Sequence, residues 1–183
     1  MVGVSRNDSS AGVVAKNWNG NLIEAYDTSA IPDDRRFYVS NSGHVYADGS
    51  FHSGGADVAE YFPVAEDPEP GTVMVIGEDS KLQRSTIAYD TTVAGIVSTA
   101  PGVSLGTNEA GNEGEKLIAV AGRVPCKVDA SYAPIEPGDL LTTSDTPGHA
   151  MKATDPQIGT ILGKALEPLD SGTAVIEVLV TLQ

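Results

Sequence analysis

The sequence predicts an all-β protein in which a thin leading segment precedes a duplicated β-clip or barrel-like domain. Three observations support this fold class. The 183 residues include 20 glycines and 11 prolines, which favour short strands joined by turns over long helices. Apolar residues occur in short alternating segments, as in half-buried strands. The longer, later part of the chain also contains an internal repeat.

The charge of the chain restricts its partners. The formal net charge is −14 at pH 7 and the eleven lysines and arginines are scattered, so we predict no binding to nucleic acid or to anionic membranes. No apolar run approaches the ~20 residues that span a bilayer, and the first residues lack the apolar region of a secretory signal. The acidity is typical of a soluble protein. Binding of Ca²⁺ by clustered carboxylates is the alternative.

Residues 1–55 are predicted to form a β-shaft segment that packs between chains. Residues 37–40 and 44–47 alternate apolar and polar side chains around the turn sequence Asn41-Ser42-Gly43, which indicates a β-hairpin. A second turn is predicted at Asp48-Gly49. The segment has too few large apolar side chains to bury its own core. It must share a core, and copies of the same chain are the favoured source.

The repeat lies within residues 63–183. Residues 69–74 recur 67 positions later, and residues 82–86 and 93–97 recur 68 positions later. In each half a Pro-Gly turn leads into a strand, a turn-rich tip and a glycine-centred strand, before a closing strand. Three matches in the same order at nearly constant spacing indicate a duplicated β domain.

The two halves of this domain are expected at about 63–125 and 130–183. Cys126, the one cysteine, is expected to be a buried structural thiol in a strand, and an intrachain disulfide is excluded. The predicted core residues are Val73, Val75, Ile96, Val97, Ile118, Val120, Leu140, Leu141, Ile161, Leu162, Ile176, Val178 and Val180.

The first half carries an insertion at residues 98–115 that is rich in Gly, Asn, Glu and Thr. Its carboxylates, among them Glu109 and Glu113, are candidate cation or ligand contacts. They lack the spacing of an EF-hand loop, so a solvated loop is the favoured interpretation. The three histidines are isolated, so we predict no zinc site and no cofactor.

A short motif at residues 53–63 separates the two regions. Residues 56–62 are predicted to form a short helical linker that ends before Pro63. In a helical turn, Asp57 and Glu60 project from one face, and two neighbouring carboxylates that share a proton suit acid–base hydrolysis. The alternative is a helix-capping Asp and a solvated Glu.

Residues 37–62, and above all the sequence Ala56-Asp57-Val58-Ala59-Glu60, resemble the passage from a fibre shaft into the self-cleaving C-terminal intramolecular-chaperone domain of phage neck appendages and tail spikes. Residues 63–183 resemble the β domain of the same proteins and of related bacterial surface fibres. The resemblance implies a homotrimer, with the β domain guiding assembly of an upstream shaft of the same protein. It also implies a location in a virion tail or at a cell surface.

In the self-cleaving members, the resemblance assigns peptide hydrolysis to an Asp and a Glu, here Asp57 and Glu60. Those members cut a Ser-Asp bond just before the acidic pair. Here Ser53 is followed by glycine, and the one Ser-Asp bond, Ser144-Asp145, lies at a predicted turn in the second half. We therefore expect a structural trimerisation and assembly module. Autoproteolysis remains open as the enzymatic alternative.

Aromatic side chains on the shaft segment support a third alternative, a glycan- or cation-binding fibre tip. Tyr38 and Tyr46 are candidate contacts for a cell-surface glycan, because aromatic rings stack on sugars. Tyrosines at such strand positions also pack between neighbouring strands and chains, and the sequence alone leaves both interpretations open.

Overall fold

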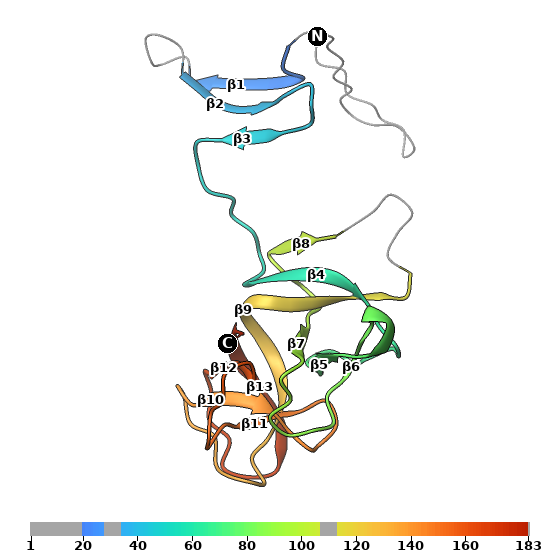
Figure 1. Ribbon diagram of the computed structural model, residues 1–183. Helices are drawn as coiled ribbons and strands as arrows, with labels where there is room; N and C mark the ends of the chain where they lie inside the picture. Colours follow the sequence, from blue (N-terminus) through green and yellow to red (C-terminus); the bar gives the residue numbers. More distant parts are fainter. Residues whose placement is uncertain (1–19, 28–33, 107–112, 183) are drawn as a thin grey trace, which may run out of the picture. The chain divides into compact units, whose positions relative to one another are not determined.

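The computed structural model describes residues 20–27, 34–106 and 113–182. In these ranges the chain is all-β, as predicted: β-strands are joined by turns and by one 3₁₀ turn, η1 (Glu78–Ser80), and no α-helix is present (Figure 1). None of the helices in the described ranges is of the length and apolarity needed to span a membrane. The chain divides into two compact units, residues 1–52 and 53–183, which are described separately.

The first unit is a three-stranded antiparallel sheet of β1 (Ile23–Asp27), β2 (Asp34–Val39) and β3 (Val45–Ala47). The predicted hairpin is β2–β3. In its turn the His44 carbonyl accepts a hydrogen bond from the Ser40 amide (2.9 Å), and Gly43 adopts φ +86°, a conformation that glycine takes without steric cost. Strand β1 was not predicted, because only two apolar neighbours, Leu22 and Ile23, marked it.

No described residue of this first unit is buried. Register places Ile23, Val39 and Val45 side by side across the sheet, with Phe37 beside Ala25 and Ala47. Because side chains alternate between the faces of a strand, these apolar residues share one face. The sheet therefore has an apolar face and no core beneath it within the described residues of its own unit.

The second unit contains the remaining strands. They are β4 (Asp57–Pro63), β5 (Val73–Ile76), β6 (Leu82–Arg84), β7 (Val93–Val97), β8 (Val103–Leu105), β9 (Glu115–Asp129), β10 (Leu140–Thr143), β11 (Ala150–Lys152), β12 (Ile161–Ala165) and β13 (Thr173–Thr181).

The predicted duplication is present in the strand pairing. Strand β5 pairs with β6 and β7, and β10 pairs in the same way with β11 and β12. Met74 lies opposite Gly95, and its repeat partner Leu141 lies opposite Gly163. Both ladders shift register at the next residue. The two halves thus share their connectivity and also the position of a β-bulge.

The long strand β9 belongs to both halves. Its beginning pairs with β7 and its end pairs with β13. Strands β9, β13, β12, β10 and β11 form a closed five-stranded barrel, which the parallel pair Val128–Ala150 completes. In the first half a parallel bridge between Val64 and Leu82 occupies the equivalent position. The pairing of β4 reaches Gly122 of β9 and that of β13 begins at Ala121, so the halves meet within β9 and not at the predicted gap between 125 and 130.

The predicted helical linker is wrong. Asp57–Pro63 is strand β4, and every one of its residues lies opposite a residue of β9. The local sequence suits a capped helical turn, but pairing with β9 satisfies the backbone of the whole segment, and such tertiary pairing overrides a weak local preference. Strand β4 is the first strand of the first half. It pairs with the beginning of β9 as the end of β9 pairs with β13 in the second half.

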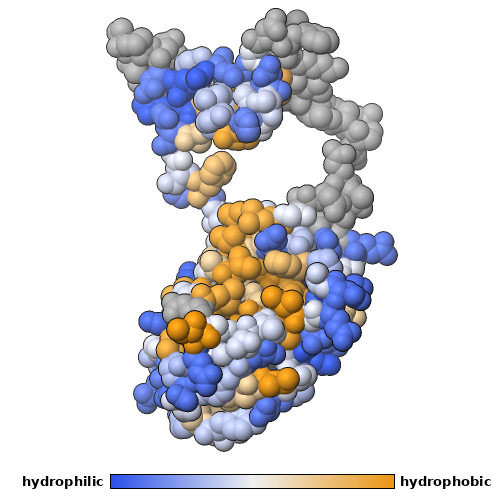
Figure 2. All heavy atoms as spheres, viewed as in Figure 1, coloured by the Kyte–Doolittle hydropathy of each residue, from blue (hydrophilic) through white to orange (hydrophobic). Residues whose placement is uncertain are grey.

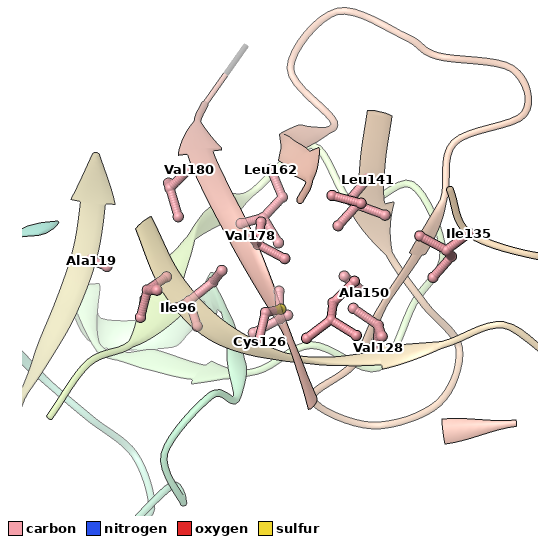
Figure 3. Close-up of a cluster of buried hydrophobic side chains, with 14 of the residues drawn as sticks. Ile96, Ala119, Cys126, Val128, Ile135, Leu141, Ala150, Leu162, Val178 and Val180 are labelled. Atoms are coloured by element: carbon pink, nitrogen blue, oxygen red, sulfur yellow. The ribbon is translucent and has the colours of Figure 1, made fainter. Parts of the chain in front are cut away.

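The core consists of two clusters, of which the larger draws residues from both halves and the smaller lies in the first half. The larger includes Cys126, Leu141, Leu162 and Val178, which point toward one another in Figure 3. The smaller consists of Met74, Leu82, Val97 and Ile118. The predicted core residues are buried apart from Val120 and Leu140. Val120 is the extra residue of β9 at the register shift opposite Val58 and Ala59.

Cys126 is fully buried, as predicted, and desolvation raises the pKa of its thiol well above the usual range. A protonated, inaccessible thiol is unreactive toward external reagents. Cys126 is therefore a core residue.

Candidate functional site

Asp57 lies at the start of β4, and its side chain is almost fully enclosed. The residue is 6% exposed, and its Oδ2 atom has no hydrogen-bond partner among the described residues. The backbone holds the segment in place, because the Asp57 carbonyl accepts from the Gly102 amide (2.8 Å) and the Ala56 carbonyl accepts from the Arg123 amide (3.1 Å). A buried carboxylate oxygen without a partner is costly, which marks Asp57 as a candidate functional residue.

A pocket of about 250 Å³ has Asp57 among its lining residues. Its walls include the glycines before β4, the residues after β7 and the middle of β9. At Gly122 in β9 a Cβ would lie 2.5 Å from the Ala56 carbonyl oxygen, so only glycine permits the close approach of β9 to β4. The lining residues with polar side chains are Asp57, Ser98, Thr99 and Arg123.

Glu60 does not share this pocket. Residues three apart on a strand point to opposite faces and lie about 10 Å apart along it. The register shift between β4 and β9 inserts its extra residue in β9, so β4 alternates regularly, with Asp57 and Ala59 buried and Glu60 half-buried. The structure therefore does not bring the two carboxylates together on one face, as the helical turn would have done.

Comparison of the two halves reveals a second unusual feature of Glu60. Glu60 lies opposite Ile118 in the first half, and Val124 lies opposite Val178 in the second. Val124 is buried in the core. A carboxylate thus occupies a position where the other half has a buried aliphatic residue. Sequence analysis missed this substitution because the recognised repeat began at residue 69, after β4.

The described part of the insertion in the first half includes a strand. Residues 103–105 form β8, which pairs in parallel with β4, so the predicted solvated loop contains an additional strand. Glu113 is exposed, and Glu109 lies outside the described residues. In the described parts of the chain, no group of three or more His, Cys, Asp or Glu side chains is arranged to hold a metal ion.

Tyr38 and Tyr46 stack on each other across β2 and β3, with ring centroids 4.4 Å apart and ring planes 9° apart. The Arg35 guanidinium lies 3.9 Å from the centroid of the Tyr38 ring and forms an ion pair with Glu24 (2.9 Å). Hydrogen bonds from Asn21 and then Arg35 lower the pKa of Glu24. Tyr38 and Tyr46 are thus brought together, and they stack on each other as cross-strand neighbours.

Asp129 shows how a buried carboxylate is satisfied elsewhere in the second unit. It is 3% exposed, and it accepts hydrogen bonds from the Thr146 hydroxyl (2.5 Å) and the Ser131 amide (2.8 Å). Burial opposes its ionisation, but these hydrogen bonds and the charge of His149 outweigh burial and lower its pKa. Asp57 has no comparable set of donors to Oδ2, so burial by itself does not explain why an aspartate stands there.

The comparisons with known proteins concern the fold. No protein-family model matches the sequence, and no curated protein matches it. A solved structure, that of the pre-mature bacteriophage phi29 gene product 12, matches with a TM-score of 0.61 and 15% sequence identity. The match covers 81% of this chain and 25% of that chain. This chain therefore spans about a quarter of the length of the phage protein, and the similarity shows a shared fold.

Proposed function

We propose that this chain is a homotrimeric structural and assembly module at the C-terminal end of a phage-type tail fibre or surface fibre protein. The observation that carries the proposal is the apolar face of the first unit, which includes Ile23, Phe37, Val39 and Val45. Nothing in the described part of that unit is buried. A small sheet with a solvated apolar face is marginal by itself in water.

Copies of the same chain are well suited to cover this face. Most soluble oligomers are closed, symmetric assemblies of identical chains. Three copies arranged around a three-fold axis would direct three such faces inward and would give the sheets the core that each lacks. The opposite face, which carries Tyr38, Tyr46 and Glu24, would then point to solvent.

The second unit supports the same proposal from its own side. It has two hydrophobic clusters of its own, so it can fold before the first unit is ordered. Residues 63–183, which make up most of this unit, are also the residues whose sequence resembles the β domain of such assembly modules. The structural match to a phage protein is in keeping with a virion component.

A pair of substitutions on adjacent residues of β3 tests this function. Val45 (54% exposed) belongs to the apolar face and Tyr46 (47% exposed) to the opposite face. We expect Val45→Asp to abolish the trimer, because it would bury three carboxylates near one axis. Tyr46→Asp should leave the trimer intact. Sedimentation equilibrium of both variants checks this, and equal association of the two would contradict the proposal.

Autoproteolysis by Asp57 and Glu60 is the second candidate. Two observations favour it: Oδ2 of Asp57 is buried without a partner among the described residues, and Glu60 stands where the second half has the buried Val124. The test is prolonged incubation of the purified protein, with and without nucleotide, followed by intact-mass spectrometry. A fragment that forms in the wild-type protein and not in Asp57→Asn or Glu60→Gln would support cleavage. An intact wild-type chain would exclude it.

A further inference from the structure

We propose that a second copy of this chain covers an apolar surface at β8. We define the β8 face as the side chains of Val58, Val103, Leu105 and Ala121 around Glu60. This inference rests on the proposed homotrimer and names the surface of the second unit through which the copies meet.

Strand register places these side chains together. Val58 pairs with Val103 on one side and with Ala121 on the other, and Glu60 pairs with Leu105. Directly paired residues lie on the same face of a sheet. Val103 and Leu105 are 46% and 45% exposed. Figure 2 shows hydrophobic side chains gathered over the region where Figure 1 draws β8, β4 and the neighbouring part of β9.

The second half of the domain has the same strand connectivity without a counterpart of this face. In the second half, β12 connects to β13 through residues 166–172, whereas β7 connects to β9 through residues 98–114, which include β8. The second half folds around the same connectivity without such a strand. The residues added to the first half thus place two large apolar side chains in solvent instead of in the core.

The same place in the first half carries the substitution of a core aliphatic by a carboxylate. Glu60 lies within the β8 face, and its repeat equivalent Val124 is buried. The first half thus differs from the second in two ways on this one surface. It has the additional apolar strand β8, and it has Glu60 where the second half has the buried Val124. Because both differences lie on the same surface and the second half folds without them, we infer that this surface serves contact with a partner.

The covalent connection to the first unit identifies that partner as another copy. Only residues 53–56 separate the first unit from β4, and the five Cα steps from residue 52 to residue 57 span at most about 18 Å. Copies that associate through their first units therefore hold their β4 strands at high effective concentration. Each copy also carries a net charge of −14, so close contact between copies is least unfavourable at a mainly apolar surface.

A second copy would also cover an open strand edge. Strand β8 pairs with β4 and with no other described strand. An exposed apolar edge strand readily pairs with other chains. A copy that packs on the β8 face would lie beside this edge and limit the access of other chains to it.

Thiol labelling of the full chain tests the β8 face. The native Cys126 is fully buried, so an introduced cysteine is the accessible thiol. We compare Leu105→Cys with Ile158→Cys, because Ile158 is 100% exposed and lies outside the β8 face. In the trimer we expect residue 105 to react with a maleimide at least tenfold more slowly than residue 158. Equal rates in a trimeric sample would overturn the inference.

Charge substitutions supply an independent measurement. Leu105→Asp and Val103→Asp should each weaken association at least tenfold, whereas Ile158→Asp should not. Because both β8 side chains are half-exposed in the single chain, circular dichroism of the variants should remain that of a folded β protein. A wild-type trimer that tolerates both β8 variants contradicts this inference and leaves the proposed function intact. A wild-type monomer contradicts the proposed function itself.

Discussion

Two buried aspartates of the second unit have different surroundings. Asp129 accepts hydrogen bonds from Thr146 and Ser131, whereas Oδ2 of Asp57 has no partner among the described residues. Asp57 lies at the start of β4, which pairs with β8 and β9, and Asp129 lies at the end of β9, opposite Thr173 of β13. The difference therefore reflects the residues placed around each carboxylate and not its depth.

We expect Asp57→Ala to leave the free energy of unfolding unchanged or to raise it by about 1–3 kcal/mol, because it removes a desolvated oxygen without removing a hydrogen bond to it. The matched control, Asp129→Ala, should lower the free energy of unfolding by about 1–3 kcal/mol, because it leaves the Thr146 and Ser131 donors without an acceptor. Urea denaturation measures both. A large loss of stability in Asp57→Ala would show that its carboxylate has a stabilising partner.

The lowered pKa of Asp129 predicts a pH dependence of stability. A carboxyl group whose pKa is lower in the folded state stabilises the fold above its unfolded pKa, and this contribution is lost as the pH falls through the folded pKa. The stability difference between the wild type and Asp129→Asn should thus be largest near neutral pH. It should shrink below the ordinary aspartate pKa of 3.8. Thermal unfolding between pH 7 and pH 3 tests this, and a difference that grows on acidification would contradict it.

At the scale of strands, turns were easier to predict than pairing partners. The turn sequences fixed the hairpin β2–β3 and the order of strands in both halves, because Gly, Pro and Asn restrict the backbone locally. The identity of β4 depended on its pairing with β9, some sixty residues away in the chain. The sequence around Asp57 and Glu60 was compatible with a helical turn, so its local pattern alone gave the wrong geometry for the candidate site.

Strand packing also explains the glycine at the centre of β7 and of β12. At Gly95 a Cβ would overlap the Ala119 carbonyl oxygen, and at Gly163 it would overlap the Leu179 carbonyl oxygen. These contacts are equivalent in the two halves, since β7 packs on β9 as β12 packs on β13. The repeat therefore conserves a close backbone approach that no side chain permits.

We expect Gly95→Ala and Gly163→Ala each to lower the free energy of unfolding by about 1–3 kcal/mol or more, because the new methyl group forces two strands apart. Gly54→Ala provides the control, since a Cβ there would meet nothing within 4 Å. Denaturant unfolding of the three variants measures the effect. If Gly54→Ala and Gly95→Ala were equally stable, the close approach of β7 to β9 would not be a constraint on the fold.

At the scale of the whole molecule, the two units differ in what they can bury. The second unit folds around clusters that include Leu141, Leu162 and Ile118. The described part of the first unit buries nothing and exposes one apolar face. Sequence composition predicted this contrast correctly, because a count of large apolar residues limits the core that a segment can form.

The most direct test of the central claim is the mass of the full chain in solution, measured by light scattering across a range of concentrations. The chain has a mass of 18.9 kDa. A homotrimer predicts three times that value, retained on dilution through the micromolar range. A mass of a single chain at every concentration would contradict the account.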